Sequence, residues 1–217
     1  MYQQMIVPQN IEQTRKFYAT DEELIEDIGK AYQDVIKQFY AAGCRNLQLD
    51  DCTWGAIVGD VAKQRYQSLG VDIEEVKARL LKVNNLALEN RPEDMVITSH
   101  ICRGNYHSTF FTSGPYDSVA DYVFAQEHVD ALLLEYDDER SGGFAPLAKV
   151  SPDKKVVLGL ITTKKPELED KDKVIARIHE AAKYIPLDRL CLSPQCGFAS
   201  CEIGNKLTEA DEWAKLA

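Results

Sequence analysis

The stretch Met95-Val96-Ile97-Thr98-Ser99-His100-Ile101-Cys102 is a short apolar run that ends in a histidine and a cysteine two positions apart. Residues i and i+2 of an extended strand point to the same side of a sheet. His100 and Cys102 would therefore present an imidazole and a thiol at one point. Zinc binds nitrogen and sulfur donors of this kind in proteins. The stretch predicts a buried strand that ends at a metal site.

Four other apolar runs have the character of strands, and together the five runs end near residues 50, 100, 135, 161 and 192. Helical patterns separate them, at about 20–43, 72–89, 117–127 and 172–184, and Thr208 caps a last helix. Strands that alternate with helices indicate parallel βαβ units. Barrels of the (β/α)₈ type and open α/β sheets both place their sites at the carboxyl ends of such strands. No glycine-rich nucleotide-binding loop is present, which disfavours the doubly wound alternative.

The first helix has the clearest start signal. Thr20 and Glu23 form a predicted capping box, and apolar residues then recur at helical spacing up to Gly43. Residues 1–19 are polar and show no period, so an irregular lead-in is expected there.

Composition limits the classes of partner. The 217 residues are 45% hydrophobic and 28% charged, with a net charge of -10, as in an ordinary soluble domain. A nucleic-acid partner is disfavoured because no cluster of Lys and Arg is present. Neither a membrane span nor a signal peptide is recognisable, so a cytoplasmic protein is expected. Six cysteines in such a protein favour thiols or metal ligands over a disulfide framework.

Two more metal-binding residue types occur at strand ends. Glu135 ends the third strand, and Cys196 follows the fifth. The predicted ligands are therefore His100, Cys102, Glu135 and Cys196, a donor set that suits tetrahedral zinc. Cys52 and Cys201 remain as substitutes.

Acidic residues also follow two of the strands. Asp50 and Asp51 stand where the first strand passes into a loop. Asp50 is a candidate for the site, with capping of the loop as its alternative role. Asp51 and the run Asp137-Asp138-Glu139 are expected to be solvated charges.

Four pieces of this chain together resemble a known family. They are Leu47-Gln48-Leu49-Asp50-Asp51, His100-Ile101-Cys102, Leu134-Glu135 and Ser193-Pro194-Gln195-Cys196-Gly197. This pattern resembles the catalytic barrel of cobalamin-independent methionine synthases, in particular the shorter single-barrel bacterial proteins. The resemblance extends from about residue 20 onward. It implies a (β/α)₈ TIM-barrel fold, present here as about five C-terminal βα units in a single domain, 1–217.

The resemblance also implies an activity. His100, Cys102, Glu135 and Cys196 would hold Zn²⁺, and Asp50 would be the catalytic and substrate-binding carboxylate that holds the amino group of homocysteine. The reaction would move a methyl group from a methyltetrahydrofolate to the homocysteine thiol, activated as a zinc thiolate, in methionine biosynthesis. Activation is needed because an alkyl thiol of pKa about 8.5 is only about 3% ionised at pH 7.

Two features depart from the family pattern. Larger methionine synthases have a histidine after the penultimate strand, whereas this chain has Thr162-Thr163. The resemblance also leaves the first three βα units unmatched, and open strand edges invite pairing. The alternatives are a related zinc-thiolate alkyltransferase with another donor or acceptor, an inactive truncated fragment, or a subunit completed by a second copy or by a complementary N-terminal barrel piece.

Overall fold

The computed structural model describes all residues, 1–217, and contains one parallel sheet in the order β1-β2-β3-β4-β5. The strands are β1 (Asn46–Asp50), β2 (Val96–Ile101), β3 (Ala131–Glu135), β4 (Lys155–Ile161) and β5 (Leu190–Pro194). Each strand pairs with its neighbour in sequence, so the order never reverses as it does in a doubly wound sheet. The fold is α/β, and the sheet is an arc of a TIM-type barrel.

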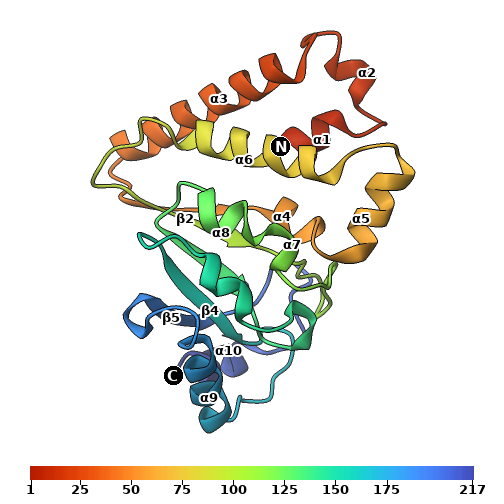
Figure 1. Ribbon diagram of the computed structural model, residues 1–217. Coiled ribbons are helices and arrows are strands. Elements are labelled where there is room, and N and C mark those ends of the chain that lie inside the picture. Colours follow the sequence, from red (N-terminus) through yellow and green to blue (C-terminus); the bar gives the residue numbers. More distant parts are fainter.

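The helices separate the strands, as the sequence predicts (Figure 1). The α-helices are α1 (Tyr2–Ile6), α2 (Ile11–Thr14), α3 (Asp21–Ala41), α4 (Cys52–Ala56), α5 (Gly59–Ser68), α6 (Ile73–Leu88), α7 (Asp117–Ala120), α8 (Val123–Gln126), α9 (Lys171–Ala181) and α10 (Glu209–Leu216). The 3₁₀ helices are η1 (Glu139–Ser141), η2 (Ala145–Lys149) and η3 (Leu187–Arg189). Figure 1 shows α1, α2, α3 and α6 at one end of the molecule, and α9 and α10 at the other.

The longest helix, α3, packs along α6. Its predicted capping box is present, with the Thr20 hydroxyl accepting from the Glu23 backbone N–H and the Glu23 carboxylate accepting from the Thr20 N–H. Gly29 permits close contact between the two helices, because a Cβ there would lie 2.5 Å from Leu86 Cγ. Asp72 caps α6 as predicted, by accepting from the Glu74 N–H.

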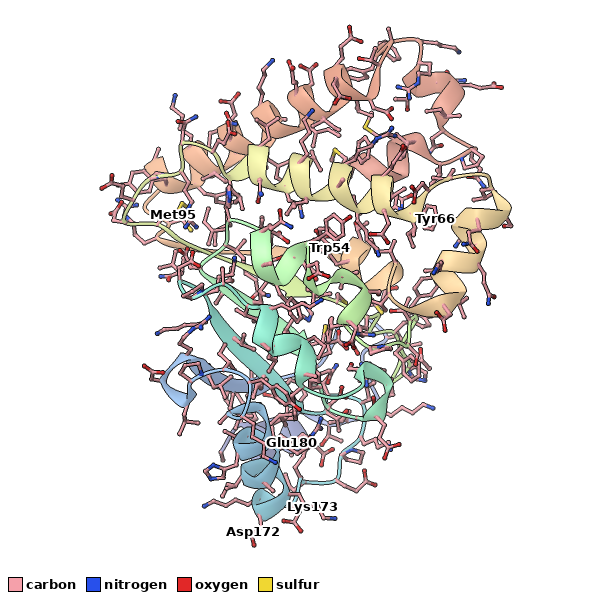
Figure 2. The ribbon with its side chains drawn as sticks, viewed as in Figure 1. Trp54, Tyr66, Met95, Asp172, Lys173 and Glu180 are labelled. Carbon is pink, nitrogen blue, oxygen red and sulfur yellow. The ribbon has the colours of Figure 1, made fainter.

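The core lies around the three inner strands. Strands β2, β3 and β4 are mostly buried, whereas β1 and β5 are half-buried or exposed along their whole length. Figure 2 shows Trp54 near the middle of the molecule, below α6, where it is fully buried. On α9, Asp172, Lys173 and Glu180 lie near the surface at the far end. None of the helices has both the length and the apolar character needed to cross a membrane.

Two predictions about the helices are wrong. Residues 1–19 are not irregular throughout, because they include α1 and α2, and Tyr2 is 1% exposed in the core. The helix predicted over 117–127 is two short helices, α7 and α8, broken at Tyr122. The Tyr122 ring stacks on Trp54, and its hydroxyl donates to Glu74 on α6. These tertiary contacts account for a break that local helix propensity does not reveal.

Candidate metal centre

The carboxyl ends of the strands meet because the sheet curves. In the β1–β2 pair, Asp50 lies beside His100. The backbone carbonyl of Gln195, just after β5, lies 3.1 Å from His100 Nε2 on β2. Three inter-strand steps of about 4.8 Å would separate β2 from β5 by about 14 Å in a flat sheet. Curvature of the barrel type therefore brings the two together.

Three of the four predicted metal ligands converge at this point. One donor atom each from His100, Cys102 and Cys196 forms a group in which every pair lies within 4.8 Å. His100 and Cys102 are buried, and Cys196 is half-buried. One nitrogen and two sulfur donors at such spacing fit a tetrahedral zinc ion, which takes its ligands at about 2.0–2.3 Å.

His100 makes a polar contact on each side of its ring. Nδ1 lies 3.1 Å from Asp50 Oδ1, and Nε2 lies 3.1 Å from the Gln195 carbonyl and 3.6 Å from Glu135 Oε1. Burial lowers the pKa of His100, but the bonds to Asp50 and Glu135 outweigh it and raise the pKa to about 10. A carboxylate on the far nitrogen of a histidine is also the usual support of a metal-binding imidazole.

The two thiols form an unequal pair. The hydrogen bond from Cys102 lowers the pKa of Cys196 and correspondingly raises the pKa of Cys102. The Gly104 backbone N–H also donates to Cys102 Sγ at 3.4 Å. One of the two sulfurs is thus already stabilised as a thiolate, the form that binds metals.

Glu135 lies beside this group but outside it. Its Oε1 accepts from the Arg103 backbone N–H at 2.8 Å, and its Oε2 accepts from Arg140 at 2.6 Å. Burial raises the pKa of Glu135, but the bonds from His100, Arg103 and Arg140 outweigh it, so the pKa is lowered. The carboxylate is fully buried and ionised, and both of its oxygens already have partners.

The protein-family model for the catalytic domain of cobalamin-independent synthases matches residues 14–214 of the sequence. The chain belongs to this family. The Bacillus subtilis protein YxjH, which is uncharacterized, is 51% identical over 200 residues, which cover 92% of this chain and 53% of YxjH. A methionine synthase from Saccharolobus solfataricus is 22% identical over 182 residues, which cover 84% of this chain and 46% of that protein. A crystal structure of a putative vitamin-B12 independent methionine synthase from Listeria monocytogenes superposes with a TM-score of 0.70 at 39% identity, and covers 90% of this chain and 52% of that one.

These matches define the family and its fold. It is a family of methyltransferases of the methionine synthase type, and the chain spans about half the length of the relatives it matches. The expected TIM-type arc is therefore confirmed, and a role in methyl transfer is supported at the level of the family.

Several members of the site were not predicted from the sequence. Arg140, which lies in η1, pairs with Glu135, Asp137 and Asp138. Asp137 is consequently not a solvated charge, because its side chain is only 2% exposed. The spacing Asp137-x-x-Arg140 is the one feature of the sequence that indicates this ion pair, since residues three apart meet on a helical turn.

Asp50 and Asp51 have different partners in this family member. Asp50 bonds to His100, whereas Asp51 caps α4 by accepting from the Thr53 N–H at 2.9 Å. Asp51 also accepts from Asn84 at 2.7 Å, so the prediction of a solvated charge is wrong for this residue. The capping role considered for Asp50 thus belongs to its neighbour.

A cavity of about 400 Å³ opens next to the metal group. Asp50, Asp51 and Cys52 line it, with apolar side chains from α3 and α6. The Asp50 side chain is 60% exposed, so its carboxylate can still receive a ligand while it holds His100.

Proposed function

We propose that this chain carries the metal centre of a zinc-dependent methyltransferase that acts on a homocysteine-type thiol. The observation that carries the proposal is the convergence of His100, Cys102 and Cys196 at the carboxyl end of the sheet. The donor set fits zinc, and Glu135 is the proposed fourth ligand. The methyl donor is proposed to be a methyltetrahydrofolate.

Bound zinc would supply the acidity that ionises the substrate thiol near neutral pH. The residues of the chain perform the remaining tasks. Asp50 orients the imidazole of His100 and offers its exposed oxygen to the substrate ammonium. Arg140 holds Glu135 ionised and buried, which keeps a hard oxygen ligand next to soft thiolates. With zinc bound, Glu135 would be the ligand that gives way to an incoming thiolate, because soft sulfur suits zinc well.

The first test is metal content. Purified wild-type protein should hold about one zinc per chain, and Cys196→Ser should lose it, because a hydroxyl is a poor ligand for zinc. Cys44→Ser is the matched control, since Cys44 lies before β1 and bonds to the Asn46 carbonyl. Full zinc retention in Cys196→Ser would refute the ligand assignment.

The second test concerns substrate binding. Asp50→Ala should weaken homocysteine binding by roughly 10-fold or more, as expected for loss of a charge-assisted contact. Zinc content should change little, because Asp50 lies outside the proposed ligand set. Calorimetric titration with homocysteine measures the affinity. An unchanged affinity would mean that Asp50 does not bind the substrate and serves only to hold His100.

Turnover is expected to depend on the rest of the barrel. The sheet is open at β1 and β5, and the match to this chain covers only 53% of its relative YxjH. We therefore propose that methionine formation from methyltetrahydrofolate and homocysteine requires a complementary barrel piece. Equal turnover with and without an added N-terminal barrel segment would contradict this dependence.

Thr162 supports a second candidate, a zinc-thiolate alkyltransferase with a different methyl donor. The Thr162 backbone N–H donates to Glu169 after β4, and the hydroxyl side chain is no acid for a leaving folate. A donor that leaves without protonation, such as a sulfonium compound, would suit this site. Competition between a methylsulfonium and methyltetrahydrofolate in one assay distinguishes the two donors.

A further inference from the structure

Lys164 is a buried cation without a counter-ion. It follows β4, at the same end of the sheet as the metal group of His100, Cys102 and Cys196, and is 7% exposed. Its ammonium nitrogen donates one long hydrogen bond, of 3.3 Å to Asn105 Oδ1, and forms no ion pair. An ammonium group has three N–H donors, and its transfer out of water is costly unless an anion compensates the charge. The positive charge of Lys164 is therefore suited to an anionic ligand.

Other buried polar groups beside Lys164 also lack partners. The side chain of Gln195, just after β5, accepts from the Thr163 backbone N–H through Oε1 at 2.6 Å, while its Nε2 has no hydrogen-bond partner. The hydroxyl of Thr163 is likewise buried and without a partner. Buried donors are normally satisfied in native proteins, so donors that gather without partners indicate a ligand that accepts from them. A carboxylate accepts several such bonds at once.

Asn105 connects Lys164 with the metal group. Its Oδ1 accepts from Lys164 Nζ, and its Nδ2 donates at 2.6 Å to the carbonyl of Gly197, the residue after Cys196. A single amide group spans the gap, which puts the ammonium within about 8 Å of the Gly197 carbonyl. In an extended homocysteine the sulfur and the carboxylate oxygens are about 6 Å apart. A thiol bound at the metal group thus has the length to carry its carboxylate toward Lys164.

The cover over Lys164 consists of loops. Asn105 belongs to the loop after β2, and Asn205, after β5, donates to Asn105 Oδ1 at 2.9 Å and to the Thr163 carbonyl at 2.8 Å. Asn205 is half-buried, and Tyr106, next to Asn105, is exposed. Side-chain amides near the surface, and not the packed core, therefore separate Lys164 from solvent.

Two other buried basic side chains at this end of the sheet already have partners. Arg140 pairs with Glu135 at 2.6 Å, and the guanidinium of Arg103 lies over the Tyr116 ring, 4.1 Å from its centre. Lys164 has neither a carboxylate nor an aromatic ring. It is consequently the basic group at this edge that is best suited to receive an anion.

We propose that Lys164 binds the carboxylate of a substrate at the metal group. The inference rests on the proposed function, since homocysteine and methyltetrahydrofolate, the two proposed substrates, both carry a carboxylate. The short distance favours the α-carboxylate of the thiol. Each charged group of homocysteine then has its own partner: the metal for the sulfur, Asp50 for the ammonium and Lys164 for the carboxylate.

A thiol without the carboxylate provides the decisive comparison. The compound 3-aminopropane-1-thiol keeps the sulfur, the carbon chain and the amino group of homocysteine. In calorimetric titration, zinc-loaded wild-type protein should bind homocysteine at least about 10-fold more tightly than this aminothiol, as expected for a charge-assisted contact. Lys164→Met should lose the preference, because it weakens binding of homocysteine alone. Lys165→Met, at the exposed neighbouring position, is the matched control and should keep it.

Titration with methyltetrahydrofolate separates the two sources of the carboxylate. If Lys164→Met weakens homocysteine binding alone, the carboxylate is that of the thiol. If it weakens binding of methyltetrahydrofolate but not of the analogue without glutamate, the carboxylate is that of the methyl donor. The urea midpoint of the substrate-free Lys164→Met protein should be no lower than that of wild type, because the substitution removes an uncompensated buried charge.

Two results would overturn the inference and leave the proposed function intact. The first is an equal loss of affinity for homocysteine and the aminothiol, together with a lower urea midpoint, which would make Lys164 a structural residue. The second is an unchanged affinity of Lys164→Met for both substrates. Failure of both thiols to bind the zinc-loaded wild-type protein would instead refute the proposed function itself.

Discussion

Glu127, at the end of α8, provides a prediction that is independent of the metal. Its side chain is fully buried, and Oε1 accepts from Asn84 at 3.2 Å, while Oε2 has no hydrogen-bond partner. Burial and the nearby charge of Asp51 raise the pKa of Glu127 from 4.5 to about 8, and the Asn84 bond offsets only part of this. The folded protein therefore holds a proton on Glu127 at neutral pH.

The magnitude follows from the shift. Below about pH 4.5 both the folded and the unfolded chain carry the proton. As the pH rises to about 8, only the unfolded chain releases it, so this residue lowers the free energy of unfolding across that window. Each pKa unit is worth about 1.4 kcal/mol, which gives a loss of up to about 5 kcal/mol. Glu127→Gln removes the titration and keeps the acceptor for Asn84.

Urea unfolding of the reduced, metal-free protein tests this prediction. The free energy of unfolding of Glu127→Gln should be within about 1 kcal/mol of wild type near pH 5, and roughly 3–5 kcal/mol higher near pH 8. Glu93→Gln, at an exposed site, controls for the loss of one negative charge. A difference between Glu127→Gln and wild type that stays constant with pH would refute the reasoning.

Two further substitutions test the packing around the metal group. In Gly55→Ala the new methyl group collides with the Cys102 carbonyl. The substitution should therefore lower the free energy of unfolding by about 1–3 kcal/mol. It should also weaken zinc binding, which competition with a chelator measures. Gly143→Ala, which meets nothing within 4 Å, should do neither, and equal effects of the two would contradict the steric argument. Arg140→Met should cost about 3–5 kcal/mol in urea unfolding, because it leaves Glu135 buried without its cation. A cost below about 1 kcal/mol would mean that the carboxylate is stable without this partner.

The strands, and the residues proposed as metal ligands, could be recognised in the sequence because both signals are local. Apolar runs mark the inner strands β2, β3 and β4, which are mostly buried, and the spacing of His100 and Cys102 places both side chains on one side of the chain at the end of β2. Helix starts were also predictable, since the capping side chains of Thr20 and Asp72 accept hydrogen bonds from backbone N–H groups within three residues. The convergence with Cys196 required in addition that the parallel sheet curve, since β2 and β5 are three strands apart in its order.

The remaining features depend on tertiary contacts that no local pattern encodes. Tyr2 and the short helices before residue 19 acquire their structure from packing on the core, and the break at Tyr122 comes from its contact with Trp54. Arg140 was overlooked because an isolated arginine in a charged loop is usually solvated. Cys52 and Cys102 lie close together because α4 packs tightly on the end of β2, and no sequence motif signals this packing.

The sequential order of the strands has a consequence for synthesis. Each strand pairs with the strand that precedes it in the sequence. Strands β1 to β4 can therefore pair in order, as each leaves the ribosome, while the chain is still growing. His100 and the chain beside Cys196 are separated by 95 residues, which take roughly 5–20 s to translate. For that interval the nascent protein presents an imidazole and a thiol without their partner across the sheet. If the proposed metal site forms, it can therefore be completed only after β5 has been synthesised.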